Sequence, residues 1–338
     1  MLILVLATPA EASEIRAPVV PQSGMDIMPE ETEDFGDALF QLMQNSIGSL
    51  FPDLRKSARS CMQLLVTALL LSLITVLPNQ SGRMTSAAAV VVILLLIFQN
   101  ADMLIHLAAD TVREICEYGK LLCLVMTSAL AAQGAMTTAS ALYAGTSVFT
   151  TLLGALISRY YVPMVYVYLV FSAANSVLGE ENLRKIADGI KSVLNWLLKT
   201  LLLVFTTYMS VTEVITGTTD MVALKAAKVT ISTVVPVVGG ILSDASESVL
   251  LSMGLMKNAA GIYGILAALA VFIGPFLKVG VQYLGLKLSA ALCSIFAAKN
   301  VSALINDAAA AMGLLLAMLA AACTIVLVST VCFLRGAS

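Results

Sequence analysis

The 338-residue sequence has few charged side chains: they make up only 12% of it, whereas hydrophobic residues make up 59%. The surface of a water-soluble domain is normally about a quarter to a third charged. A chain this poor in charge cannot cover a soluble globule of its size. Several apolar stretches are also long enough to cross a bilayer. The composition therefore predicts an all-α protein, a polytopic transmembrane helical bundle.

Histidine is nearly absent as well, because His106 is the single one in the chain. A histidine-based zinc site or a serine–histidine–acid triad would depend on that one residue. The net charge of -2 provides no basic face for nucleic acid. Nucleotide-binding P-loops and the common metalloprotease, serine-hydrolase and EF-hand motifs are missing too. We therefore expect no enzyme activity, no metal, no cofactor and no nucleic-acid partner.

The six cysteines occur singly within or beside apolar runs, and none forms a CxxC pair. Their spacing indicates neither a disulfide framework nor a metal site. We interpret them as small apolar packing residues. They are Cys61, Cys116, Cys123, Cys293, Cys323 and Cys332.

The N-terminal part of the chain differs from the rest. Residues 1–12 are typical of a signal peptide, with an apolar run before the small-x-small pattern of residues 10–12, although an unprocessed hydrophobic end stays open because the run lacks a basic residue before it. Residues 13–34 are acidic and interrupted by prolines, which predicts an extended tether. Apolar residues at helical spacing up to residue 54 predict an amphipathic helix in the membrane interface. A small helix packed against a partner domain is the alternative. This gives 13–59 as a region outside the bilayer and 60–338 as the transmembrane domain.

The transmembrane domain contains a series of apolar segments of spanning length, for which we expect about eight to ten crossings. The segments are 60–78, 85–101, 120–134, 141–158, 161–178, 193–214, 229–251, 259–277, 279–298 and 311–334. We expect breaks at 78–82, at Arg159, and at 179–191, 216–220 and 299–307, where polar residues, Pro or Gly concentrate. The segments at 120–134 and 141–158 are short enough to be broken or re-entrant.

A polar stripe is the first candidate functional feature. Its members, Asp102, His106, Asp110, Arg113 and Glu117, step by four, four, three and four residues, so they share one face of a helix. Inside a bundle, this face would line an aqueous cavity or pass protons, because ionisable groups at membrane depth are costly and usually functional. At a surface, it would be the solvated face of an interfacial helix. The spacing does not decide between the two.

The second candidate lies in residues 217–258, where PVVGG interrupts an apolar segment. Proline removes a backbone donor and glycine loosens a helix, so this sequence predicts a kink or break. Transporters use broken helices to hold ions or substrates, although simple bending remains the alternative. The candidate residues are Asp220, Lys225, Lys228, Pro236, Gly239, Gly240, Asp244, Glu247 and Lys257.

Residues 217–264 read GTTDMVALKAAKVTISTVVPVVGGILSDASESVLLSMGLMKNAAGIYG. This stretch resembles the core signature of the stage III sporulation protein AE family of endospore-forming Firmicutes. Its most specific part is the D-x-x-x-x-K-x-x-K, P-V-V-G-G and D series. The resemblance extends to the architecture, from a signal-like start through a short N-terminal region to many hydrophobic segments.

The resemblance implies a multi-pass protein of the mother cell membrane around the forespore. It implies partners among the other stage III sporulation proteins of the same operon and, indirectly, stage II sporulation protein Q. Together these would form a trans-envelope channel needed for late forespore development, with this chain as its permease-like subunit. The family gives no catalytic residues to carry over. An autonomous secondary transporter and a non-conducting scaffold are the alternatives.

Overall fold

The computed structural model describes residues 18–25, 27–28, 35–76, 82–234, 239–296 and 299–336, and throughout this described part the regular structure is helical. The elements are α1 (Gln22–Met25), α2 (Phe35–Val76), α3 (Gly82–Ala132), α4 (Met136–Leu156), the π-helix η1 (Ile157–Tyr161), α5 (Val162–Leu178), α6 (Glu181–Val234), α7 (Gly239–Phe296) and α8 (Lys299–Arg335). The prediction of an all-α bundle is confirmed. Within the described residues, five helical stretches are long and apolar enough to cross a membrane: Val91–Ala132, Met136–Leu178, Glu181–Thr212, Asn258–Ile295 and Asn300–Arg335.

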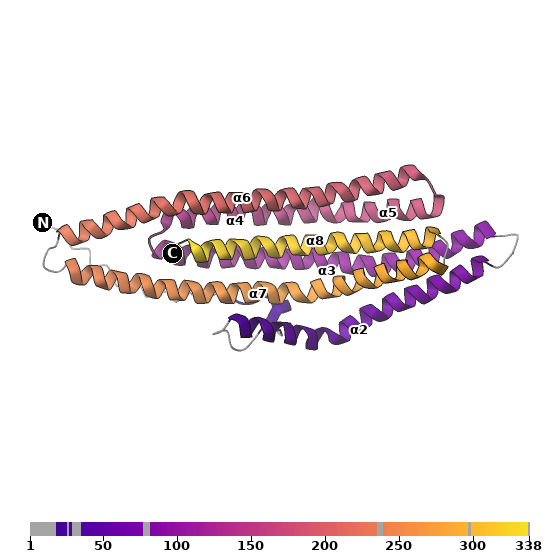
Figure 1. Cartoon of the computed structure of the whole chain (residues 1–338), viewed down its shortest axis with the longest axis horizontal. Coiled ribbons are helices and arrows are strands. Elements are labelled where there is room, and N and C mark those ends of the chain that lie inside the picture. The colour runs from indigo at the N-terminus through magenta and orange to yellow at the C-terminus, as the bar shows by residue number, and fades with distance from the viewer. Residues whose placement is uncertain are drawn as a thin grey trace.

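The long helices run side by side, with α8 in the middle (Figure 1). Helix α8 contacts α3, α4, α5, α6 and α7, and its most apolar stretch is the most buried of the five, at 61%. Alanines at Ala308, Ala309, Ala311, Ala321 and Ala322 are buried along it. Small side chains let helix backbones approach closely in a membrane, where van der Waals packing drives association. The alanine-rich sequence therefore explains why α8 is the centre.

Tyrosine and threonine hydroxyls tie the α4–α5 segment to α8. Tyr161 donates to the backbone carbonyl of Leu314 at 3.0 Å, and Thr146 donates to Ser329 Oγ at 3.1 Å, with both bonds buried. A buried hydroxyl without a partner is costly in an apolar medium, so each bond fixes the helices in register. These contacts hold the α4–α5 segment against the middle and C-terminal parts of α8.

The helices are longer than the sequence suggested. Helix α3 has 51 residues, α6 has 54 and α7 has 58, so at 1.5 Å per residue they are about 77 to 87 Å long, against about 30 Å for the hydrocarbon core of a bilayer. Segments expected to be separate are joined: 85–101 with 120–134 in α3, and 259–277 with 279–298 in α7. A continuous helix keeps the backbone hydrogen bonds satisfied through the polar residues between two apolar segments, and this favours one long helix over two short ones.

Two of the expected breaks are wrong. Helix α6 continues through residues 216–220 without interruption. At Arg159 the chain forms the π-helix η1 instead of a turn, and Pro163 follows in the first turn of α5. A π turn absorbs the hydrogen bond that a proline cannot donate, so the helix passes this point without breaking. At 78–82 and 179–191, by contrast, one helix ends and the next begins. The break expected at 299–307 falls just before it, because α7 ends at Phe296 and α8 then continues through 299–307.

Helix α2 joins the expected amphipathic helix to the first expected span. Near its start, Ala38 and Leu42 are buried against Leu266 and Ala270 of α7, whereas Phe40 and Phe51 are exposed. The amphipathic pattern therefore provides a packing face toward α7 and an apolar face turned outward. The expected signal peptide lies outside the described residues.

Candidate functional site

The polar stripe occupies the outer face of α3. All five members, Asp102, His106, Asp110, Arg113 and Glu117, are exposed. Between them, Ile105, Ala108, Val112, Ile115 and Cys116 are buried against the rest of the bundle. The shared face that the spacing predicted is therefore present, but within one chain it points away from the bundle.

One end of the stripe contacts α5. The Tyr166 hydroxyl donates to Asp102 Oδ1 at 2.7 Å, and His106 Nε2 lies 3.8 Å from the same carboxylate oxygen. Asp102 and His106 remain 60% and 68% exposed in their side chains. This contact orients the Asp102 carboxylate without covering the stripe.

Two cavities adjoin the inner face of α3, and both are too small to form part of a route for ions or solutes. One cavity lies among Cys123, Thr146 and Ser329, and the other among Ala101, Gln282 and Met312. Each has a volume of about 10 Å³, which is about enough for one water molecule. Gly119 and Gly264 also allow the helices to meet closely, since a Cβ at either position would clash with Val326 or Leu122.

The second candidate region forms the tip of the α6–α7 hairpin. Helix α6 ends at Val234 and α7 begins at Gly239, and both tips extend past the end of α8 in Figure 1. Figure 1 shows α6 and α7 on opposite sides of α8 and running in opposite directions, so α7 leads back along the bundle. The predicted interruption at PVVGG thus coincides with the ends of two helices.

The candidate residues of this region are distributed over both arms of that hairpin. Asp220, Lys225 and Lys228 lie on α6, and Gly239, Gly240, Asp244, Glu247 and Lys257 lie on α7. Pro236 lies outside the described residues, as do the side chains of the other eight. Their proposed roles therefore stay predictions.

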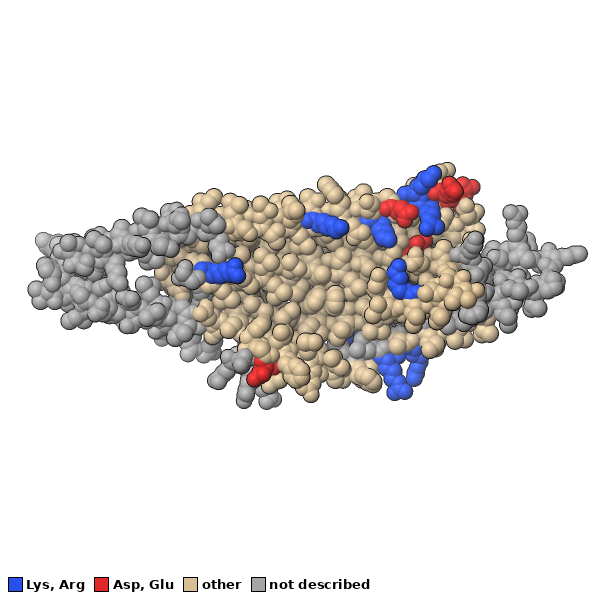
Figure 2. Space-filling view, in the orientation of Figure 1, with Lys and Arg blue, Asp and Glu red and all other residues tan. Residues whose placement is uncertain are grey.

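A charged cavity that the sequence reading missed lies at the opposite end of the bundle. It measures about 600 Å³ and is lined by residues of α5, α6 and α8, including Arg184, Lys185, Asp188 and Asn300. Arg184 Nε lies 4.0 Å from Asp188 Oδ2. Figure 2 shows Lys, Arg, Asp and Glu gathered at this end, with a mostly uncharged middle. The charged run 179–191 signalled a helix connection but gave no sign that α8 would complete a cavity.

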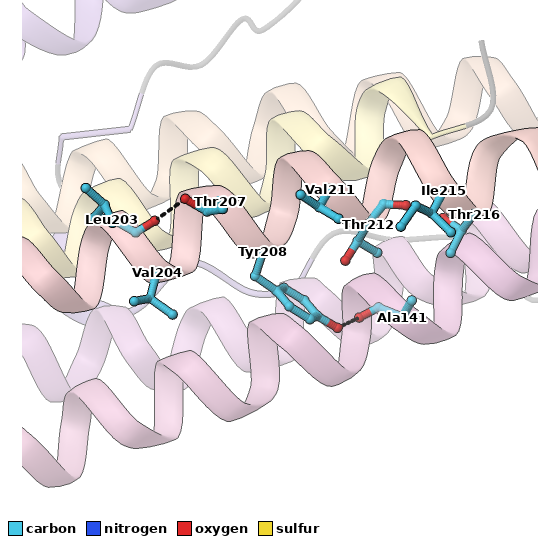
Figure 3. A pocket seen from close by; sticks show the side chains of 9 residues that line it. All are labelled: Ala141, Leu203, Val204, Thr207, Tyr208, Val211, Thr212, Ile215 and Thr216. Atoms are coloured by element: carbon cyan, nitrogen blue, oxygen red, sulfur yellow. Dashed lines mark hydrogen bonds between the residues drawn. The ribbon is translucent and has the colours of Figure 1, made fainter.

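An apolar groove lies between α4 and α6 (Figure 3). Its volume is about 510 Å³, and its lining, which includes Ala141, Leu203, Val204 and Val211, has no carboxylate, amine or guanidinium group. The Tyr208 hydroxyl points across it and donates to the Ala141 carbonyl at 3.1 Å. Such a groove has no charged group to bind an ion.

The described residues do not gather three or more His, Cys, Asp or Glu side chains into a group that could hold a metal ion. The described cysteines Cys116, Cys123, Cys293, Cys323 and Cys332 are free and buried. They pack among helices, as the sequence led us to expect.

Comparison with known proteins places the chain in a family. The family model described as stage III sporulation protein AE matches residues 27–336, almost the whole chain. The chain belongs to the stage III sporulation protein AE family. The match includes both the α3 stripe and the α6–α7 hairpin, so both candidate regions are part of the family's domain.

A curated relative is stage III sporulation protein AE of Bacillus subtilis (strain 168), which is 22% identical over 175 residues. The match covers 52% of this chain and 44% of the relative, so it spans less than half of the relative's length. No solved structure matches the chain. Membership of the stage III sporulation protein AE family and five apolar helices of spanning length together identify a sporulation membrane protein.

Proposed function

We propose that this chain is the permease-like membrane subunit of a channel complex between the mother cell and the forespore. Its place would be the mother cell membrane around the forespore, and its role would be non-enzymatic. The family match over residues 27–336 carries the proposal, and the five apolar helices support a multi-pass arrangement. Its partners would be the other stage III sporulation proteins of the same operon and, indirectly, stage II sporulation protein Q.

Deleting the gene in its own endospore-forming host tests the proposal. We expect the forespore to be engulfed normally and a late forespore reporter gene to stay at background, because the channel would lack its membrane subunit. A fluorescent fusion should encircle the forespore, and a second copy of the gene should restore reporter expression. Normal late expression in the deletion strain would contradict the proposal.

The lysines of the α6–α7 hairpin provide a sharper functional prediction. Replacing Lys225 and Lys228 with Ala should abolish late forespore expression while protein levels stay normal, because the hairpin tip would then lose the positive charge beside a proposed polar path. The control removes two lysines elsewhere on α6 that do not line the charged cavity, with Lys191→Ala and Lys199→Ala. Normal forespore development in the Lys225→Ala, Lys228→Ala strain would remove the pair from the mechanism.

A non-conducting scaffold is the second candidate, and the small cavities beside α3 favour it. Single cysteines placed along residues 229–251 discriminate between the two functions. A water-filled route would let a membrane-impermeant thiol reagent label one face of the segment, whereas a scaffold would leave that segment unlabelled.

A further inference from the structure

The α3 stripe is in the wrong place for a face turned to lipid. It belongs to the helical stretch Val91–Ala132, which is long and apolar enough to cross a membrane. At its two ends, Ala101 shares a cavity with Met312 of α8 and a Cβ at Gly119 would meet Val326 of α8, so the stripe lies beside the buried, apolar middle of that helix. Along α3, exposed Leu95 precedes the stripe and exposed Leu121 and Leu124 follow it. From Asp102 to Glu117 the rise is about 23 Å, most of the hydrocarbon thickness of a bilayer. Charged groups facing lipid at this depth are costly and almost always face protein or water.

The described residues of the chain leave this face uncovered. The contact with α5 reaches Asp102 at one end, whereas Asp110, Arg113 and Glu117 are exposed beyond it. The opposite face of α3 is closed, since its two adjoining cavities hold about one water molecule each. Whatever satisfies the stripe must therefore come from outside the described part of this chain, and a second copy in the same membrane can supply it.

Around Arg113, the charges on this face can pair with those of a second copy of the same face. Arg113 has an acid one turn away in each direction, Asp110 at i-3 and Glu117 at i+4. Two copies in one membrane keep the same orientation, so a twofold axis along the membrane normal brings the stripe against its own counterpart at equal depth. A long arginine side chain then reaches an acid of the other copy one turn, about 5.4 Å, above or below it.

We propose that the outer face of α3 is an interface with a second copy of this chain, in which Arg113 of each copy pairs with Asp110 or Glu117 of the other. Exposed Leu121 and Leu124 lie on the same side and add apolar contact beside the charges. Within the proposed function, to which this inference adds, a polar path would then lie between copies, along α3, and not inside one bundle.

Cysteine cross-linking tests the interface directly. A Leu121→Cys reporter keeps all stripe charges and lies four residues after Glu117, on the same face. In a background with the native cysteines replaced by Ala, reconstituted at low density in phospholipid vesicles, mild oxidation should give a disulfide-linked dimer. The control is Leu203→Cys on α6, which is 66% exposed but lies across the bundle, and it should stay monomeric. No dimer from Leu121→Cys, or equal dimer from both reporters, would overturn the proposal.

Charge reversal then tests the pairing. Arg113→Glu in the Leu121→Cys background should lower the cross-linked fraction about tenfold or more, as expected when one member of a desolvated charge pair is reversed. Adding Glu117→Arg should restore it, because each copy again presents opposite charges one turn apart. The charge pairing is overturned if Arg113→Glu does not lower the cross-linked fraction. It is also overturned if the Arg113→Glu, Glu117→Arg variant does not regain that fraction.

The vesicle experiment needs no sporulation partners. A negative result there would overturn the interface between copies but would not test the proposed function, which the forespore reporter experiment tests separately. In sporulating cells, a cross-link from Leu121→Cys to a different protein in place of a second copy would also overturn the proposal.

Discussion

A Gly145→Ala variant should be markedly less stable than the wild-type protein. A Cβ at this position would clash with Cε1 of the Tyr208 ring, at a separation that real Cβ atoms do not tolerate. The ring cannot move freely, because its hydroxyl donates to the Ala141 carbonyl and its centroid lies 5.9 Å from the centroid of the Phe149 ring. Overpacking of this kind typically costs about 1–3 kcal/mol.

The measurement is thermal unfolding of the purified protein in detergent, compared with Gly154→Ala on the same helix. A Cβ at Gly154 meets nothing within 4 Å, so this control should keep the wild-type stability or gain up to about 1 kcal/mol from the better helix propensity of alanine. Opposite signs for the two substitutions are the expected result. A stabilised Gly145→Ala variant would show that the Tyr208 ring of α6 does not pack against Gly145 of α4.

Leu315→Lys should have an even larger effect and prevent the bundle from forming. Leu315 is completely buried at the centre of α8, where an ammonium group would have neither water nor a carboxylate to interact with. An unpaired charge in such a place costs at least several kcal/mol, which is comparable to the whole stability of a domain. We expect the variant to be lost from the membrane fraction or to elute as aggregate in detergent size-exclusion chromatography.

Val331→Lys is the matched control on the same helix. Val331 is 37% exposed and lies near the C-terminal end of α8, so a lysine there can extend its ammonium group toward the interface. It should accumulate and elute as the wild-type protein does. Equal accumulation of both variants would be inconsistent with α8 as the buried centre.

The polar stripe shows what the spacing of residues along a helix can predict and what it cannot. Steps of four, four, three and four residues place Asp102 and Glu117 on one helical face whatever surrounds the helix, and the structure confirms that face. Whether the face points into the bundle or away from it depends on which side of α3 packs against α8 and α7. That choice is made by residues far away in the sequence, so spacing along α3 could not decide it.

The helix ends were only partly predictable from local sequence. Pro and Gly at 78–82 and 235–240 correctly indicated that helices end nearby, because these residues weaken a helix wherever they occur. Residues 216–220 and Arg159 gave similar local signals, yet the helix continues through both. At Arg159 a π turn accommodates the following proline, and no local pattern in the sequence reveals such an adjustment.

Composition alone determined that this protein belongs in a lipid bilayer as helices, because 12% charged residues cannot cover a soluble surface, and the residues at 217–264 determined its family. Only the tertiary structure decided that α8 is the central helix, that the Tyr208 ring packs against Gly145, and that the charges of α3 face outward. The physical reason is that hydropathy and spacing act within a helix, whereas direction and partner depend on how separate helices fit against one another.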